Sequence, residues 1–179
     1  LRAGIARRLS KNDDMILGIH ITPNGVAAKV TPELGLKFTS VPPIREAFNG
    51  VVADAKFRIP AYEANYKIMK GTTFSKKTRI LAFGAHMHLR GKYFLAELIY
   101  PDGTRTKALE IPQWKFDWQY TYKLADPLDI PAGTRLEFTG IYDNSAANPN
   151  NPDPSKDVTY GQQSFEEMFI GYYDWHPLD

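Results

Sequence analysis

The chain of 179 residues contains no cysteine, which excludes disulfides, zinc ribbons and thiol catalysis. It also lacks any apolar run long enough to cross a bilayer, so we expect no membrane span. Its net charge of +2 is small and its Lys and Arg residues are dispersed, which argues against nucleic acid as a partner. What remains is a globular protein, because 43% hydrophobic and 13% aromatic residues are enough to build a core.

Two further absences bear on the organisation of the chain. It does not begin with methionine, and its first stretch, LRAGIARRLSKNDDM, has neither the apolar region nor the cleavage site of a signal peptide. We therefore expect an internal start within a longer protein. The chain also has no long helical periodicity, and only PIREAF, residues 43–48, hints at a helical turn.

Short strand-like stretches make up most of the chain. Thirteen prolines and thirteen glycines separate runs rich in β-branched and aromatic residues. This spacing predicts an antiparallel sandwich or barrel, with the asparagine- and proline-rich residues 143–155 as a surface loop. The predicted strands are residues 14–21, 34–40, 51–59, 78–89, 93–100, 104–111, 116–124, 134–142 and 165–175.

Histidine is scarce, with four in the chain, and two of them are His86 and His88 in the stretch GAHMHLRG. A strand places residues i and i+2 on one face, so both imidazoles project from the same side, with Gly84 leaving open space beside them. The pair is either two hydrogen-bonded strand histidines or two metal ligands. The opposite face, which belongs in the core, carries Leu81, Phe83, Ala85, Met87 and Leu89.

A metal at this pair needs a third ligand that is not histidine. No histidine lies between His88 and His176, which excludes a zinc site of the carbonic-anhydrase type, and no glutamate follows closely, as a cupin requires. A thioether is soft and selects copper, and Met168 lies on a second strong strand. Met168 taken alone is more often a core residue, so both interpretations stay open. We expect His176 at the surface and His20 on the polar face of its own stretch.

Three motifs in order carry a resemblance to a known family. HMHLRG matches a His-x-His strand, GQQSFEEM matches a late Ser/Thr-x-acidic-Glu-Met motif, and ILGIHITPNG resembles a single-histidine strand of a preceding domain. With these motifs the chain resembles the copper type II, ascorbate-dependent monooxygenases, the peptidylglycine α-hydroxylating monooxygenase family. It is most similar to bacterial modules of this type that stand beside c-type cytochrome segments.

The resemblance implies a fold of two antiparallel, jelly-roll-like β-sandwiches, each holding one copper ion. Residues 1–50 would be the C-terminal part of the first sandwich, and residues 51–179 would be the complete second one. An extracellular or periplasmic location is implied by the family alone.

The resemblance also implies the site residues. His86, His88 and Met168 would hold the catalytic copper, where O2 binds and a substrate C–H bond is attacked with electrons from a reductant. His20 would be one of three histidine ligands of a second, electron-delivering copper. Tyr172 keeps the family's aromatic position beside the catalytic copper.

The sequence departs from the family in three places. It contains no His-His pair, so an upstream part of the protein or another chain would supply the two missing ligands of the second copper. Gly84 stands where peptide-hydroxylating members have an arginine that holds the substrate carboxylate. Ile170 replaces a polar residue, which makes the pocket more apolar. We therefore expect a small substrate that is not a peptidylglycine.

Two other functions remain open at this stage. The first is a non-catalytic copper-binding or electron-transfer module that serves a partner such as a c-type cytochrome. The second is a sandwich that binds no metal and serves in assembly. The aromatic residues Trp114, Trp118 and Tyr120 could form a binding or electron-relay surface, but we interpret them as core.

Overall fold

The computed structural model describes residues 1–19, 21 and 24–178, and all regular structure within them is β-strand. None of these residues belongs to a helix that could cross a membrane. The chain divides into two compact units, Leu1–Ala47 and Phe48–Asp179. That residues 1–50 end a preceding sandwich stays a prediction.

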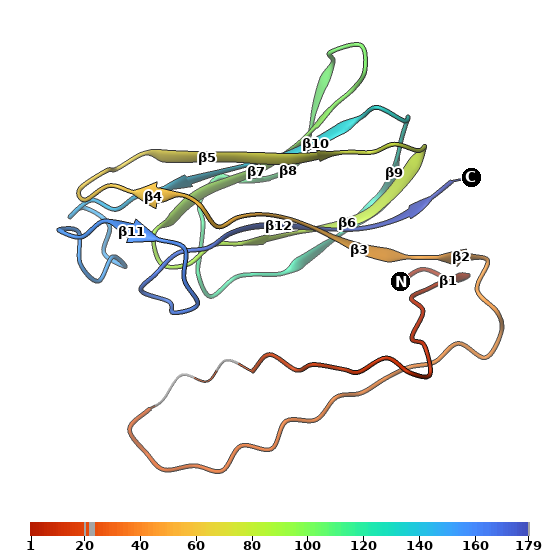
Figure 1. Cartoon of the computed structure of the whole chain (residues 1–179), viewed down its shortest axis with the longest axis horizontal. Helices are drawn as coiled ribbons and strands as arrows, with labels where there is room; N and C mark the ends of the chain where they lie inside the picture. Colours follow the sequence, from red (N-terminus) through yellow and green to blue (C-terminus); the bar gives the residue numbers. More distant parts are fainter. Residues whose placement is uncertain (20, 22–23, 179) are drawn as a thin grey trace. The chain divides into compact units, whose positions relative to one another are not determined.

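The second unit is an antiparallel β-sandwich, as the sequence predicts. Its two four-stranded sheets lie over one another in Figure 1, and every strand pair within them is antiparallel. One sheet has the order β5 (Tyr66–Thr73), β10 (Arg135–Tyr142), β7 (Gly91–Ile99) and β8 (Arg105–Ile111). The other has the order β3 (Phe48–Asp54), β12 (Phe169–Pro177), β6 (Thr78–His86) and β9 (Thr121–Ile130). A small ladder joins β4 (Arg58–Ile59) to β11 (Val158–Thr159).

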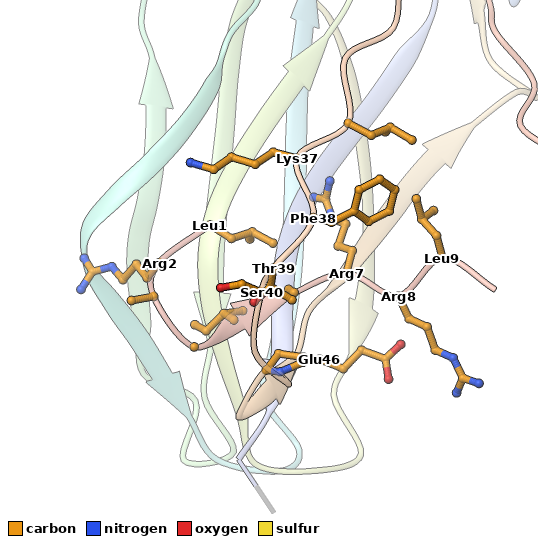
Figure 2. Close-up of a pocket in the computed structure, with 16 residues that line it drawn as sticks. Leu1, Arg2, Arg7, Arg8, Leu9, Lys37, Phe38, Thr39, Ser40 and Glu46 are labelled. Atoms are coloured by element: carbon orange, nitrogen blue, oxygen red, sulfur yellow. The ribbon is translucent and has the colours of Figure 1, made fainter. Parts of the chain in front are cut away.

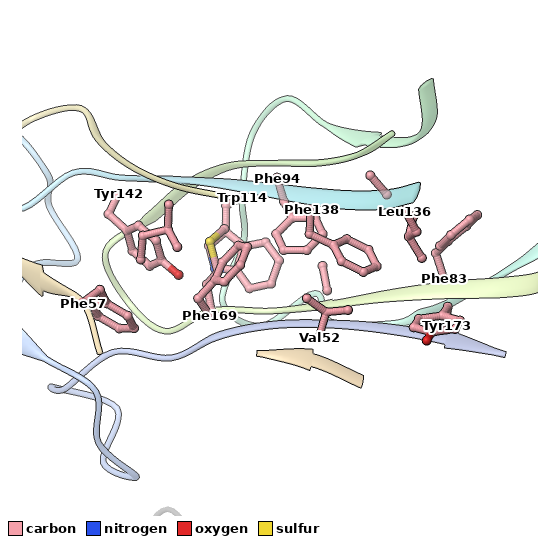
Figure 3. Close-up of a cluster of buried hydrophobic side chains, with 14 of the residues drawn as sticks. Val52, Phe57, Phe83, Phe94, Trp114, Leu136, Phe138, Tyr142, Phe169 and Tyr173 are labelled. Atoms are coloured by element: carbon pink, nitrogen blue, oxygen red, sulfur yellow. The ribbon is translucent and has the colours of Figure 1, made fainter. Parts of the chain in front are cut away.

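Aromatic rings and glycines interlock between the sheets. The ring of Phe138 on β10 fills the place that a Cβ on Gly171 of β12 would occupy, with ring carbons 2.4 Å from that position. In the reverse sense, the ring of Phe169 on β12 lies 2.9 Å from the Cβ position of Gly140 on β10. Figure 3 shows Phe94 and Phe138 from one sheet meeting Phe169 from the other. These rings are fully buried and have no free space around them. Strands β10 and β12 can therefore approach this closely only because the residue that faces each ring is a glycine.

Strand β6 has its inward face largely as predicted. Phe83, Ala85 and Met87 lie in the core cluster. The pairing of β6 shifts register between Ile80 and Ala82, so Ile80 joins that cluster in place of Leu81. A β-bulge adds one residue to a strand, so the residues on one side of it change the face to which they point. The replacement of Leu81 by Ile80 in the core is the expected consequence.

Several boundaries differ from the prediction. Strand β5 was not predicted, and β9 begins at Thr121 rather than 116 and continues through Pro127. Residues 143–155 contain no strand, as expected, but they are not wholly at the surface, because Asn144 is fully buried.

The first unit has little regular structure. Its strands β1 (Ile5–Ala6) and β2 (Arg45–Glu46) form a short parallel pair. Of the strand predicted at residues 14–21, the described part contains no strand, and residues 34–40 contain none either. The extended segments 1–9 and 36–46 line an open hollow of about 1080 Å³, and Figure 2 shows the side chains around it. Among the described residues, its lining includes none of His86, His88 and Met168.

Candidate metal site

His86 and His88, two of the predicted metal ligands, are neighbours at one end of the β3-β12-β6-β9 sheet. His86 is the last residue of β6 and pairs with Ile170 of β12. The ladder ends at this pair, and both His88 and Met168 lie just beyond it. Hydrogen bonds from the backbone N–H of His88 to the Glu167 carboxylate and between His88 Nδ1 and the Glu166 carbonyl hold the segment just before Met168 beside His88.

The two imidazoles are neighbours. Their ring centroids are 5.0 Å apart and their planes stand at 86°. His88 is 3% exposed, whereas His86 is half-buried at the end of its strand. The ring of Phe116 stands almost perpendicular to that of His88, with 6.2 Å between centroids. Both rings therefore sit in a partly dry environment, where hydrogen bonds to them are strong.

Each ring uses its Nδ1 atom in a hydrogen bond within the protein. His88 Nδ1 lies 3.1 Å from the carbonyl oxygen of Glu166, and His86 Nδ1 lies 2.6 Å from Oε1 of Gln119. A carbonyl oxygen can only accept, so Nδ1 of His88 carries the proton and Nε2 carries the lone pair. Metal-ligating histidines have this arrangement, in which one nitrogen donates to the protein and the other faces the metal.

Met168 precedes β12 and is 6% exposed. Its backbone carbonyl accepts a hydrogen bond of 2.7 Å from the hydroxyl of Tyr142, which is itself fully buried. Burial, aided by the nearby negative charge of Glu167, raises the pKa of Tyr142 well above its usual value. The hydroxyl therefore remains a proton donor, and it fixes the backbone from which the Met168 side chain projects.

The carboxylate of Glu167 joins the two parts of the site. Its Oε2 accepts the backbone N–H of His88 at 2.8 Å and its Oε1 accepts that of Arg90 at 2.6 Å. The residue is fully buried, and burial raises its pKa to about 7 although these two hydrogen bonds and the charge of Arg90 act in the opposite direction. Glu167 thus holds the turn after β6 against the segment that carries Met168.

The side chain of Arg90 also stabilises this turn. Its Nε donates to Oδ1 of Asn144 and its guanidinium donates to the carbonyl of Phe165, each at 2.8 Å. Its side chain is almost fully buried, and burial lowers its pKa despite the attraction of Glu167. The guanidinium of Arg90 and the carboxylate of Glu167 are both buried and hydrogen-bonded, so the loss of either side chain would leave its buried partners without these bonds.

Tyr172 lies on the same face as His86. It pairs with Gly84, and this pair is two residues along each strand from the pair of Ile170 and His86. Its Cβ lies 3.3 Å from the position that a Cβ on Gly84 would take. The prediction that Gly84 leaves open space is therefore wrong, because Tyr172 fills it. Partial burial, with a smaller effect of Tyr160, raises the pKa of Tyr172.

Of the other two histidines, His20 lies outside the described residues, and His176 does not join this site. His176 is 2% exposed, so the prediction of a surface position is wrong. It pairs with Arg79 near the start of β6, whereas His86 is at the end of that strand.

The segment between β8 and β9, residues 112–120, contacts both His86 and His88, which the sequence did not predict. Trp114 is buried, and its indole Nε1 donates to the carbonyl of His88 at 3.1 Å. Trp118 and Tyr120 are 60% and 55% exposed, so the prediction that they belong to the core is wrong. Their rings contact each other with centroids 4.6 Å apart. In the sequence, the only indication of a functional role for Gln119 was its position among these aromatic residues.

Among the described residues, no group of three or more His, Cys, Asp or Glu side chains could hold a metal ion. A site here accordingly depends on two imidazoles and the thioether of Met168. The chain matches no model of a known protein family, and no curated protein is recognisably similar to it.

Proposed function

We propose that the chain is a copper-dependent monooxygenase module. His86, His88 and Met168 would hold the copper ion, and O2 and a reductant would be consumed to hydroxylate a C–H bond of a small substrate. The observation that carries this proposal is the pair of imidazoles 5.0 Å apart, each with Nδ1 in a hydrogen bond within the protein, while Glu166 and Glu167, just before Met168, contact His88.

The donor set suits copper better than zinc. Two imidazoles and a soft thioether favour Cu(I), and zinc sites use thiolate, imidazole or carboxylate ligands instead. Three protein ligands also leave a position for a small molecule. When bound, copper would supply the one-electron chemistry that activates O2.

The neighbouring residues support an apolar substrate. Ile170 and Tyr172 extend the ligand-bearing face along β12, and Gly84 carries no charge with which to bind a carboxylate. The role of the protein residues is then to orient a small apolar molecule beside the copper and to exclude water. Tyr172 is the residue that we place in contact with the substrate.

X-ray absorption of the reduced, copper-loaded protein tests the site. We expect nitrogen scatterers and one sulfur scatterer in the wild-type protein, and loss of the sulfur in Met168→Leu. Met69→Leu is the matched control, because Met69 lies on β5 in the other sheet and is 44% exposed. Zinc binding without a sulfur contribution would overturn the proposal.

Oxygen consumption tests the activity. With ascorbate as reductant and a panel of small apolar substrates, we expect O2 uptake coupled to a hydroxylated product. His86→Ala should abolish it, and uptake that survives this change would rule out the proposed copper as its source.

A second candidate is a copper module that transfers electrons without catalysis. It is favoured by the histidine count, since outside the site only His20 and His176 remain and His176 lies near the other end of β6. Electron exchange of the reduced copper protein with a c-type cytochrome, in the absence of any O2 uptake, would support this candidate over the monooxygenase.

A further inference from the structure

We infer that Gln119 selects the nitrogen with which His86 binds copper, because it holds this imidazole in the Nδ1–H tautomer. This inference rests on the proposed copper site but concerns a residue outside the ligand set. Gln119 is a positioning residue, since it acts on the metal only through His86.

The orientation of the Gln119 amide is fixed by a second hydrogen bond. Its Nε2 donates to the carbonyl oxygen of Phe116 at 2.7 Å. Since that carbonyl can only accept, the NH2 group must face Phe116, and Oε1 must face the ring of His86. The turn at residues 116–117 that presents this carbonyl is closed by a backbone hydrogen bond from Trp118 to Lys115.

An amide oxygen at 2.6 Å dictates the protonation of His86. If the proton were on Nε2, the lone pair of Nδ1 would face the lone pairs of Gln119 Oε1 at hydrogen-bond distance, which is repulsive. With the proton on Nδ1, the same contact is a short hydrogen bond. The lone pair is then on Nε2, the nitrogen on the far side of the ring.

Gln119 also restrains the rotation of the ring. The torsion about the Cβ–Cγ bond of histidine is broad and nearly two-fold, so packing alone selects an orientation weakly. His86 is only half-buried at the end of β6, so its hydrogen bond to Gln119 adds to the restraint. Loss of that bond would remove the acceptor that favours Nδ1–H and would loosen the direction of Nε2.

The two histidines differ in how their tautomers are set. The Nδ1 of His88 donates to a backbone carbonyl, that of Glu166, which no side-chain substitution removes. The Nδ1 of His86 depends on a side chain 33 residues away in sequence. A change at residue 119 should therefore act on His86 and leave His88 as an internal reference in the same molecule.

Nitrogen NMR of the metal-free protein tests the tautomer without any copper. At alkaline pH, where histidine is neutral, two-bond ¹H–¹⁵N correlations distinguish Nδ1–H from Nε2–H. We expect Nδ1–H for both His86 and His88 in the wild-type protein. Gln119→Leu should move the proton of His86 to Nε2, Gln119→Glu should restore Nδ1–H because a carboxylate also accepts, and His88 should not change.

The matched control is Gln113→Leu, the same substitution at an exposed position of the same segment. Gln119→Ala is a second variant that removes the acceptor without adding an apolar branch. An Nε2–H signature for His86 in the wild-type protein would overturn the inference. So would an Nδ1–H signature that persists in both Gln119→Leu and Gln119→Ala.

A Cu(I) competition titration then links the tautomer to the metal. We expect Gln119→Leu to lower the affinity about 10- to 100-fold, as loss of a partner of a metal-bound histidine does, and Gln113→Leu to leave it unchanged. If the wild-type protein binds copper and Gln119→Leu binds it equally well, the inference fails while the proposed function stands. If the wild-type protein binds no copper, the proposed function fails, and the NMR result alone decides the role of Gln119.

Discussion

Residues 14–21 and residues 78–86 carry the same kind of sequence pattern, yet the second stretch forms a strand and the described part of the first does not. Leu17, Ile19 and Ile21 alternate as a strand requires, but they are 53%, 50% and 62% exposed. Ile80 and Phe83, in contrast, are buried, and their strand has hydrogen-bonded neighbours on both sides. Alternation predicts which face of a strand would be apolar, whereas pairing and burial decide whether the strand forms.

The same contrast holds for charged residues. Every Lys, Arg, Asp and Glu in residues 1–47 is exposed. Residues 48–178 bury Arg90, Glu137 and Glu167, and the first and last of these support the candidate metal site. The sandwich can thus hold polar groups in fixed positions, which a metal site requires, whereas the described part of the first unit buries no charged side chain.

The largest expected effect comes from the replacement of a phenylalanine by alanine, made once in each of the two regions. Phe138→Ala removes a fully buried ring and should lower the free energy of unfolding by about 3–5 kcal/mol. Phe38→Ala removes a ring that is 74% exposed and should change it by less than about 0.5 kcal/mol. Urea denaturation of the whole chain, followed by signals from both units, measures both. Equal costs would show that residues 1–47 pack as tightly as the sandwich does.

The buried carboxyl of Glu167 should make stability depend on pH. Its pKa rises from 4.5 to about 7 on folding, so the folded state binds more protons between these values. The free energy of unfolding should therefore fall as pH rises from about 4.5 to about 7, by about 3 kcal/mol from this group. Urea denaturation of the metal-free protein across this range measures the slope.

Glu167→Gln should remove this part of the slope, because glutamine does not titrate. Glu46→Gln, at an exposed position of the first unit, is the control and should leave the slope as it is in the wild-type protein. If Glu167→Gln keeps the full pH dependence, the carboxyl of Glu167 titrates at its ordinary pKa in the folded protein.

The sequence was a good guide to the sandwich, for a definite reason. Strands such as β10 and β12 alternate between core and outer residues, so their periodicity is visible in isolation. Strand β5, YKIMKGTT, was missed because lysines and a glycine interrupt its pattern at the edge of its sheet. Likewise the bulge at Leu81 depends on what the neighbouring strands require and leaves no local mark.

The groups that support the ligands were not predictable from the sequence. Gln119 contacts His86 across 33 residues, and Glu166 contacts His88 across 78. Glutamine and a backbone carbonyl have no motif that indicates such a role. Glu167 was part of the quoted motif, but only the fold shows that its carboxylate accepts hydrogen bonds from the turn after β6.

The smallest effect in this comparison concerns a single methyl group. In Gly171→Ala the new Cβ would lie 2.4 Å from the ring of Phe138, which is fully buried and packed against Phe94 with 5.6 Å between centroids. Because that ring has little space to move, we expect the free energy of unfolding to fall by about 1–3 kcal/mol.

Gly35→Ala is the counterpart in the first unit, where nothing lies within 4 Å of the new Cβ. We expect a change of less than about 0.5 kcal/mol. Phe138→Leu combined with Gly171→Ala should recover part of the loss, since the smaller side chain makes room for the methyl group. Urea denaturation of the single and double variants measures this coupling. If the two substitutions are simply additive, the close contact between ring and glycine does not limit the approach of the two sheets.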